Sequence, residues 1–583
     1  MRTHRAGELR AEHAGEQVTL AGWVARHRDH GGVLFVDIRD ASGIAQVVID
    51  PEQHPEAATL RMEFAVEVSG QVRSRPEGTA NPDLPSGEVE VAAEELTILS
   101  PAEPLPFMVW EREEVDERTR LQYRYLDLRR PRMAENLRAR SEMIRAIRDV
   151  LFERGFLEIE TPTLVRSTPE GARDLLVPSR LRQGRFYALP QSPQLYKQLL
   201  MISGVERYFQ IARCYRDEDF RSDRQVEFTQ LDLEGSFWEE EGVQETIEAV
   251  IAEVVRRLRN TDLQLPLPRI TYAEAVARYG TDKPDLRFGM EIADLTEAFE
   301  GTEFRVFADV LADGGTIRGF NRGPLGLSRA GLDDLVERAK ELGAGGLIWA
   351  EVTEDGIRSP VAKALTPEEQ YSVAEGLGAT TGDQLMLVAD RADVTASVLG
   401  QLRLDLGQPD GHEELEFAWV TDFPVFDVNE AGELVPSHHP FTAPADISEM
   451  RKDPSNAVSR AYDLVVNGVE LGSGSVRIHD PETQSAVFDI LGIGREEAES
   501  RFGWFLEALR YGTPPHAGFA VGLDRLLAVL RQEKSIREVI PFPKTQTGMD
   551  PLTDTPDRVG DDQLEELGLD LRPAVRRALE EEE

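Results

Sequence analysis

Two arginine-bearing segments contain the residue types best suited to chemistry in this sequence. The first, residues 213–221, is a charged stretch between two predicted strands and carries Arg216. The second, residues 518–525, is a glycine-bearing strand that leads through Arg525 into an apolar helix. Glycine lets a strand approach a ligand closely, and the planar guanidinium donates paired hydrogen bonds to phosphate groups. Each segment indicates a polyphosphate grip, and neither is specific by itself.

A predicted hairpin brings two acidic side chains together. Its turn is Asn467-Gly468, a strong two-residue turn signal. Pairing about this turn sets Val465 opposite Glu470 and places Asp463 on the same face, diagonal to Glu470. The two carboxylates would then share an ion; two solvated strand acids are the alternative.

A third segment, residues 154–162, ends a helix at Gly155 and enters a strand that Pro162 stops. By itself this pattern indicates only a helix cap followed by a strand.

Bulk composition narrows the class of protein. The chain has 583 residues, of which 41% are hydrophobic and 29% charged, as in a globular protein of about three or four domains. No run reaches the roughly 18 apolar residues of a membrane helix, and the charged N-terminus does not resemble a secretory signal. With Cys214 as the only cysteine, a disulfide framework and a cysteine zinc site are excluded. We therefore expect a cytoplasmic protein with no membrane partner.

The formal net charge of -41 argues against a nucleic-acid partner unless positive charge is concentrated locally. Residues 26–28 and 118–140 are two such concentrations. They are either solvated surface or a basic track that steers a polyanion to one face of an acidic molecule.

The elements that must position these residues begin with a predicted β-barrel. Five short strand-like runs fall within residues 1–105, which is typical of a small barrel of the OB type. In one run Leu34, Val36 and Ile38 share a face, which leaves Phe35 on the polar face. An aromatic ring there suits stacking on a base, although a partly covered surface phenylalanine is an equal alternative.

The three segments, in this order and at this spacing, match the signature motifs of class II aminoacyl-tRNA synthetases. Residues 168–174, 191–197 and 522–525 resemble the aspartyl-tRNA synthetases, and the sequence after residue 287 resembles the insertion of their bacterial type. The resemblance covers essentially the whole chain. The third motif usually carries glutamate before its arginine; here the residue is Asp524, as in aspartate-type members.

The resemblance implies a multidomain α/β (α+β) fold built on an antiparallel catalytic sheet flanked by helices. The expected domains are an OB-fold anticodon-binding domain (1–105), a hinge (106–140), a catalytic domain in two parts (141–287 and 413–545), an inserted α/β domain (288–412) and a C-terminal extension (546–583).

The resemblance also assigns the catalytic site. Arg216 and Arg525 are the catalytic residues, at the α- and γ-phosphates of ATP. The ATP-binding residues are Arg216, Asp217, Glu218, Gln225, Glu470, Gly522, Leu523, Asp524 and Arg525. The magnesium ligands are Asp463 and Glu470, which agrees with the hairpin argument. The aspartate-binding residues are Glu170, Gln194, Leu195, Tyr196, Lys197, Arg216, Asp232, His438 and Arg477.

Within the implied aspartate site, Arg477 and Lys197 clamp the side-chain carboxylate. Neutral asparagine would leave both cations unpaired, at a cost of several kcal/mol. Asp232 and Gln194 receive the α-amino group, and His438 lies beside the substrate carboxylate.

The implied anticodon site comprises Arg26, Arg28, Phe35, Gln46 and Glu90. Relatives that charge both tRNA(Asp) and tRNA(Asn) tend to carry histidine and glycine at the positions of His30 and Gly78. We therefore expect a non-discriminating enzyme whose Asp-tRNA(Asn) passes to an amidotransferase. The resemblance further implies a homodimer formed through residues 154–162.

Several alternatives remain open. The enzyme could discriminate in favour of tRNA(Asp), adenylate an amino acid without tRNA, or be specific for asparagine or lysine. A non-catalytic RNA-binding paralogue is a further possibility, but such proteins typically lose the ATP arginines or the magnesium acids, which are present here.

Overall fold

The computed structural model describes residues 2–110, 114–168, 172–407, 414–429 and 431–581. The chain divides into two compact units, Met1–Ala134 and Glu135–Glu583.

The first unit contains the expected barrel. Its strands are β1 (Gln17–Asp29), β2 (Leu34–Asp40), β3 (Gly43–Ile49), β4 (Ala65–Ser74) and β5 (Val89–Ser100), closed in the order β1-β2-β3-β5-β4. Leu34, Val36 and Ile38 are buried in its core, whereas Phe35 is half-buried on the opposite face of β2. The parity argument from the sequence is confirmed.

The expected hinge is folded onto this unit as two short helices, α1 (Glu117–Gln122) and α2 (Arg124–Asp127). Arg120 and Arg124 both donate to Asp127, at 2.9 and 2.6 Å. Arg129 lies 2.7 Å from Glu63. These three arginines therefore take part in ion pairs within the unit, and Arg124 is buried and cannot form part of an exposed basic track.

The second unit is built on an eight-stranded sheet. Its order is β11 (Arg269–Thr271), β17 (Phe417–Thr421), β20 (Ala461–Val466), β21 (Val469–Val476), β22 (His516–Gly522), β10 (Glu227–Ser236), β9 (Arg207–Tyr215) and β6 (Leu157–Glu158). The interior pairs are antiparallel, and only the two edge pairs, β11 with β17 and β6 with β9, are parallel. This is the expected catalytic sheet.

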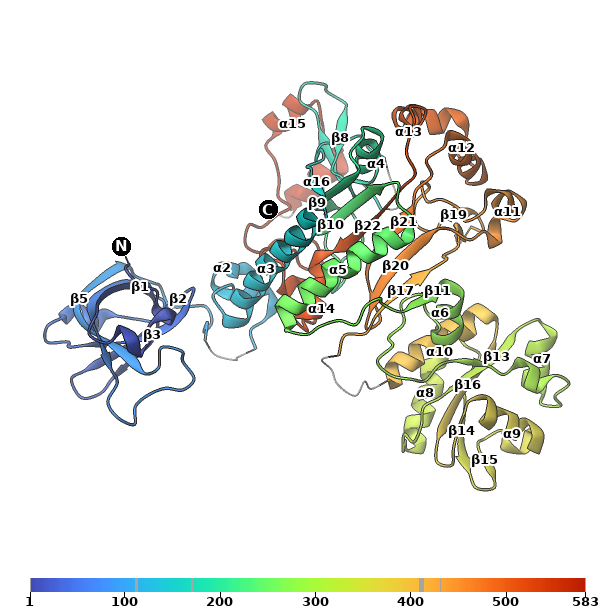
Figure 1. Cartoon of the computed structure of the whole chain (residues 1–583), viewed down its shortest axis with the longest axis horizontal. Helices are drawn as coiled ribbons and strands as arrows, with labels where there is room; N and C mark the ends of the chain where they lie inside the picture. The colour runs from blue at the N-terminus through green and yellow to red at the C-terminus, as the bar shows by residue number, and fades with distance from the viewer. Residues whose placement is uncertain (1, 111–113, 169–171, 408–413, 430, 582–583) are drawn as a thin grey trace. The chain divides into compact units, whose positions relative to one another are not determined.

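Alternation along the strands gives the sheet one apolar and one polar face. In β10, Leu231 and Leu233 join the core formed with α3 (Pro131–Glu153), α5 (Glu240–Arg259) and α14 (Leu523–Leu530) (Figure 1). Asp232 and Glu234 point to the other face, near α4 (Gln194–Ile202). Because strand side chains alternate, the apolar core fixes which acids face the opposite side.

The insertion forms the expected α/β domain. Its sheet has the order β12 (Ala293–Asp294), β13 (Thr316–Asn321), β16 (Gln384–Asp390), β14 (Ile348–Thr353) and β15 (Gly356–Arg358). Its helices are α7 (Arg305–Ala312), α8 (Arg329–Glu341), α9 (Pro367–Gly376) and α10 (Ala392–Leu406). Two apolar clusters pack on this sheet, one containing Phe320 and Met386 and the other Ile317 and Leu385. Helix α10 also packs on α6 (Tyr272–Tyr279) of the catalytic part (Figure 1).

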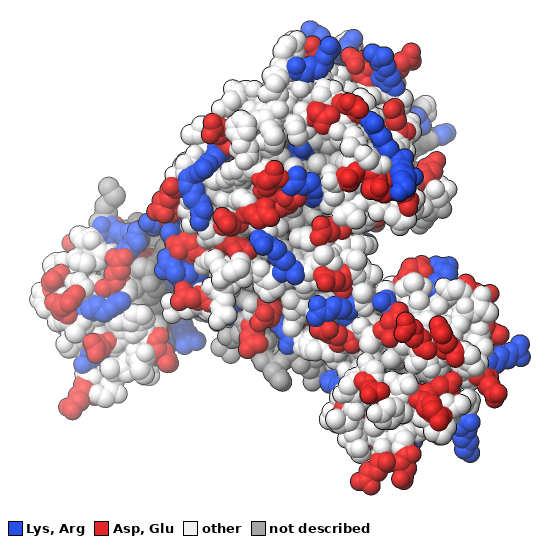
Figure 2. All heavy atoms as spheres, turned by 45° about the vertical axis from the view of Figure 1, so that its right-hand side comes forward, with Lys and Arg blue, Asp and Glu red and all other residues white. Residues whose placement is uncertain are grey.

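The remaining elements flank the sheet. They are β7 (Leu176–Pro178), β8 (Phe186–Ala188), β18 (Phe426–Val428), β19 (Leu434–Pro436), α11 (Ile447–Lys452), α12 (Pro481–Ile490), α13 (Arg495–Ala508), α15 (Asp561–Leu567) and α16 (Pro573–Glu581). None of the helices within the described ranges is long and apolar enough to cross a membrane. Acidic and basic side chains are interspersed over the face seen in Figure 2.

Candidate active site

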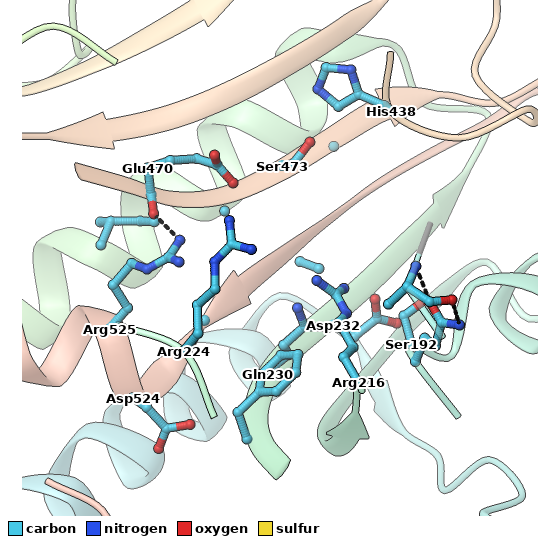
Figure 3. A pocket seen from close by; sticks show the side chains of 18 of the residues that line it. Ser192, Arg216, Arg224, Gln230, Asp232, His438, Glu470, Ser473, Asp524 and Arg525 are labelled. Carbon is cyan, nitrogen blue, oxygen red and sulfur yellow. Dashed lines mark hydrogen bonds between the residues drawn. The ribbon is translucent and has the colours of Figure 1, made fainter. Parts of the chain in front are cut away.

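A cavity of about 600 Å³ opens on the polar face of the catalytic sheet. Figure 3 shows Arg525, Arg224 and Glu470 towards one end and Arg216 and Asp232 towards the other. Twelve residues predicted from the sequence line it: Gln194, Lys197, Arg216, Glu218, Gln225, Asp232, His438, Glu470, Arg477, Gly522, Asp524 and Arg525.

Other predicted residues lie outside this lining. Leu195 and Leu523 are buried in apolar clusters. Tyr196 packs against Trp504, with ring centroids 6.0 Å apart. Asp217 lies 3.5 Å from Arg173. Asp463, a predicted magnesium ligand, is also outside the lining and lies 3.1 Å from His438, which lines the cavity.

Glu170 lies outside the described residues.

The two arginines proposed to grip phosphate are held in place by the protein. The guanidinium of Arg216 lies 5.1 Å from the ring centre of Phe228. Arg525 donates to the backbone oxygen of Glu470 at 2.6 Å and lies 3.3 Å from Asp223. A fixed guanidinium loses less conformational entropy when it binds an anion, which favours preorganised phosphate contacts.

Asp524, which precedes Arg525, has a bracing role. Its carboxylate accepts hydrogen bonds from Arg140 at 2.5 Å and from the backbone nitrogen of Thr229 at 2.8 Å. These bonds tie the start of α14 to α3 and β10, so Asp524 positions Arg525.

Two more predicted nucleotide-site residues are anchored by neighbours. Gln225 exchanges two hydrogen bonds with the backbone of Lys544, at 2.8 and 3.1 Å. Glu218 accepts from Arg224 at 3.2 Å.

The carboxylate pair forms as the hairpin predicts, with one irregularity. Val465 pairs with Glu470, but a bulge after Leu464 sets Asp463 opposite Ser473. Burial and the negative charge of Asp463 raise the pKa of Glu470. The two acids therefore repel each other across the cavity wall, and a cation between them would relieve that repulsion.

These acids fit a magnesium site that is completed by substrate. Within the described ranges, no three acidic, histidine or cysteine side chains cluster as a metal site. Magnesium is commonly held by one or two carboxylates together with water and substrate phosphates. The donor chemistry of Asp463 and Glu470 fits the protein's share of such a site.

The other end of the cavity holds a buried ionic network. Lys197 Nζ lies 2.6 Å from Asp232 and 3.2 Å from Glu234. Arg477 donates to Glu234 through Nε at 2.9 Å and NH2 at 3.2 Å. The argument that asparagine would leave both cations unpaired is therefore wrong, because Glu234 and Asp232 pair with them.

Glu234 is the main residue that sequence reasoning missed. Burial raises its pKa, but the charges of Arg477 and Lys197 outweigh burial and leave the pKa below its ordinary value. One signal was available: Glu234 follows Asp232 by two residues on a strand, so both must face the same side.

Asp232 retains one unused oxygen. Its Oδ1 accepts from Lys197, whereas Oδ2 is buried and has no hydrogen-bond partner in the described part of the chain. The nearby Tyr208 hydroxyl donates to Gln210 Oε1 at 3.0 Å, and burial together with the Asp232 carboxylate raises the pKa of Tyr208 well above its ordinary value. Burial raises the pKa of Asp232. An unsatisfied buried carboxylate oxygen is costly, so this atom is suited to receive a ligand ammonium group.

The two adjacent histidines have different roles. His438 lies 3.1 Å from Asp463. Burial alone would lower the pKa of His438, but Asp463 raises it above its ordinary value. His439, which was not predicted, lies 2.8 Å from Arg477 NH1. Burial and Arg477 hold the pKa of His439 well below its ordinary range, so it acts as a neutral acceptor.

The predicted anticodon residues form a second constellation on the barrel. Gln46 donates to Glu90 at 2.8 Å, and Arg28 donates to Gln46 at 3.4 Å. The ring of Phe35 meets that of His30 edge-on, with centroids 5.7 Å apart. The structure thus places Phe35 beside His30.

The two remaining anticodon-domain predictions lie on the barrel surface. Arg26 is exposed, and burial raises the pKa of Asp37 despite the opposing charges of Arg28, Arg75 and Arg26. Gly78 lies in an exposed turn with φ +82°.

Comparisons with known proteins agree with this architecture. Residues 116–546 match the family model described as tRNA synthetases class II (D, K and N), and residues 18–99 match the OB-fold nucleic acid binding domain. The chain is 52% identical to proteins from Moorella thermoacetica and Rubrobacter xylanophilus, both named Aspartate--tRNA(Asp/Asn) ligase. Each match covers 99% of this chain and 98% of the relative.

Solved structures share the fold. An asparaginyl-tRNA synthetase from Pyrococcus horikoshii, complexed with asparaginyl-adenylate, is 22% identical with a TM-score of 0.57, and the match covers 92% of this chain and 97% of that one. Another, from Entamoeba histolytica, is 18% identical with a TM-score of 0.57, over 91% and 95% of the chains.

Proposed function

The chain belongs to the class II tRNA synthetases (D, K and N), and from this premise we propose that it joins L-aspartate to tRNA(Asp) and tRNA(Asn) at the expense of ATP. The full-length relatives at 52% identity carry the name of that activity.

The observation that carries the proposal is the division of one cavity into two chemically distinct ends. Arg525 and the carboxylate of Glu470 mark the nucleotide end, whereas Arg477 and Lys197 mark the amino-acid end. Arg216 lies in the same cavity, where it can reach the bond that the reaction forms.

Activation then follows as an in-line displacement. The α-carboxylate of aspartate attacks the α-phosphorus of ATP, and pyrophosphate leaves. Arg216 stabilises the charge that develops on the α-phosphate, and Arg525 holds the γ-phosphate. The terminal 3′-hydroxyl of tRNA then attacks the carbonyl carbon of aspartyl-adenylate and releases AMP. Positioning and charge supply the catalysis, without a covalent protein intermediate.

The amino-acid end selects aspartate through charge balance. Arg477 and Lys197 face Glu234 and Asp232, and the substrate adds one ammonium and two carboxylates. The ammonium group satisfies Asp232 Oδ2, and the side-chain carboxylate lies near Arg477 and the cationic form of His438. Asparagine would bring an amide dipole to a site built for a negative charge.

Magnesium bound by Asp463 and Glu470 would neutralise charge on the ATP phosphates. The chain's own part is to hold these two carboxylates on adjacent strands.

The barrel reads the anticodon of both tRNAs. Phe35 stacks on a base, while Gln46, Glu90 and the arginines Arg26 and Arg28 contact base edges and phosphates. His30, against Phe35, and Gly78 in its exposed turn relax the choice between tRNA(Asp) and tRNA(Asn). The second product, Asp-tRNA(Asn), requires a partner amidotransferase.

We propose a cytoplasmic homodimer. Apolar side chains near the first motif are more than half exposed, among them Phe152, Leu157 and Leu164. Exposed apolar side chains grouped around one segment are typical of a subunit interface.

Amino-acid-dependent exchange between ATP and pyrophosphate tests the activation step. We expect exchange with aspartate and at least about a hundredfold less with asparagine, because the site is built for a charged side chain. Equal exchange with both amino acids would contradict the proposed selectivity. Exchange without transfer to any tRNA would identify an adenylating ligase instead.

A further inference from the structure

A buried arginine of the inserted domain reaches into the catalytic part of the chain. Arg403, on α10, is fully buried. Its Nη2 atom donates to the backbone oxygens of Asp285, Phe288 and Gly289, at 2.7, 2.9 and 3.1 Å. Its guanidinium lies 4.4 Å from the ring centre of Phe288 and 4.9 Å from that of Tyr279.

Burial of the Arg403 guanidinium in this way costs free energy. Nε and NH1 of Arg403 are buried and have no hydrogen-bond partner within the described ranges. Burial lowers the pKa of Arg403. A buried cation with unused donors is a poor way to stabilise a core, so its defined contacts point to a positioning role.

The segment that Arg403 contacts, residues 280–289, is also held by other close contacts. A Cβ atom at Gly280 would lie 2.2 Å from the backbone oxygen of Ala396, so α10 meets the start of the segment backbone to backbone. Further along, Arg287 donates two hydrogen bonds to Asp285, at 3.0 and 2.6 Å.

The same segment supports the turn of the carboxylate hairpin. A Cβ atom at Gly468 would lie 3.4 Å from Asp285 Cβ and 3.9 Å from the backbone oxygen of Lys283. On the other side of the turn, Asn467 donates to the backbone oxygen of Glu414 and accepts from the backbone nitrogen of Glu416. The Asn467-Gly468 turn is therefore contacted both by residues that lead into the inserted domain and by residues that follow it.

Lys283 extends from this segment into the cavity. It is exposed there and lines the cavity together with Glu470 and Arg525. Besides Arg525 and Arg224, a further cation thus lines the nucleotide end together with Glu470, the carboxylate proposed to hold magnesium.

We propose that Lys283 is a further nucleotide-binding residue that contacts the outer phosphates of ATP, and that Arg403 positions it from the inserted domain. This inference rests on the proposed ATP-dependent function. An ammonium group is a compact charge suited to a leaving pyrophosphate, and a lysine on a loop needs a rigid support to hold that charge in place. The inserted domain provides the support.

Two measurements on the full chain test the inference: the calorimetric Kd for ATP with magnesium, and KM values in pyrophosphate exchange. We expect Lys283→Met to weaken ATP binding about tenfold while KM for aspartate changes less than about twofold, because one charge-assisted contact to phosphate is lost. Arg403→Met and the milder Arg403→Lys should weaken ATP binding in the same selective way. Arg391→Met, an exposed residue at the start of α10, is the matched control and should change nothing.

The double variant separates positioning from a general structural role. If Arg403 acts through Lys283, Lys283→Met with Arg403→Lys should bind ATP no more weakly than Lys283→Met alone. Unchanged ATP affinity in Lys283→Met would overturn the proposal. Multiplicative losses in the double variant, or equal rises in both KM values, would overturn the role of Arg403. Lack of aspartate-dependent exchange in the wild type would instead refute the proposed function, and the calorimetric ATP measurement remains valid in that case.

Discussion

Glu234 and Asp232 determine the electrostatics of the amino-acid end. The cations Lys197 and Arg477 each contact a protein carboxylate and line the cavity proposed to bind substrate. The site therefore holds a balanced set of charges before substrate arrives, and selectivity depends on how substrate groups complete that set.

Replacement of Glu234 tests this balance through stability. The pKa of Glu234 is lowered in the folded state. Its contribution to the free energy of unfolding is therefore present above the unfolded-state pKa near 4.5 and is lost as pH falls through the folded-state pKa. Glu234→Gln should cost about 3–5 kcal/mol at pH 7, since it leaves buried cations uncompensated. It should also flatten the loss of stability on acidification.

Denaturant unfolding at several pH values, followed by tryptophan fluorescence, measures both effects. Glu245→Gln is the control, because Glu245 is exposed on α5. Identical acid profiles for Glu234→Gln and wild type would refute the assigned balance.

Replacement of Asp232 tests the contact with the substrate ammonium. Asp232→Asn keeps the shape but removes the charge that Oδ2 offers. We expect KM for aspartate to rise about 10–100-fold, the value of one hydrogen bond to a charged group, with KM for ATP nearly unchanged. Steady-state pyrophosphate exchange provides both constants, and a rise confined to ATP would place Asp232 elsewhere in the reaction.

At the scale of elements, glycines in β22 set how closely the strands approach. A Cβ atom at Gly518 would lie 1.8 Å from Glu234 Oε2 and 2.4 Å from the backbone oxygen of Leu233. At Gly522, the nearest atom would be 3.6 Å away. The glycine-bearing motif is therefore required in part by the neighbouring strand and its buried acid.

The two glycines should differ sharply on substitution. Gly518→Ala should destabilise the catalytic unit by several kcal/mol, because overpacking costs about 1–3 kcal/mol and displacement of Glu234 adds to it. Gly522→Ala should leave the melting temperature nearly unchanged. Similar melting temperatures for the two variants would argue against the close approach of β10 and β22.

The hairpin shows how far sequence could predict the site. The Asn467-Gly468 turn fixed the pairing of Val465 with Glu470, because turn geometry is local. The bulge after Leu464 was not predictable, since it depends on packing between strands that lie far apart in the chain. Strand alternation could have placed Glu234 beside Asp232, but its partner Arg477 is 243 residues away and no local pattern indicates it.

Whole-molecule organisation separates the proposed recognition of tRNA from the proposed activation of aspartate. The barrel with Phe35 and His30 belongs to one compact unit, and the cavity with Arg216 and Arg525 belongs to the other. Substitutions in the barrel should therefore affect tRNA choice without affecting adenylate formation.

His30→Leu tests that separation. We expect it to leave aspartate-dependent pyrophosphate exchange unchanged and to reduce charging of tRNA(Asn) at least about tenfold more than charging of tRNA(Asp), the scale of one lost base contact. Equal losses on both tRNAs would remove His30 from the discrimination. A loss of pyrophosphate exchange would show that the two units are coupled.

The most direct test of the central claim is aspartylation of purified tRNA(Asp) and tRNA(Asn) transcripts by the wild-type protein, compared as kcat/KM. We expect aspartate to be attached to both transcripts, with kcat/KM values that differ by less than about a thousandfold. A larger difference would amount to discrimination between the two tRNAs. Charging of tRNA(Asp) with a larger deficit on tRNA(Asn) would contradict the relaxed specificity, and charging of neither would contradict the proposed function itself.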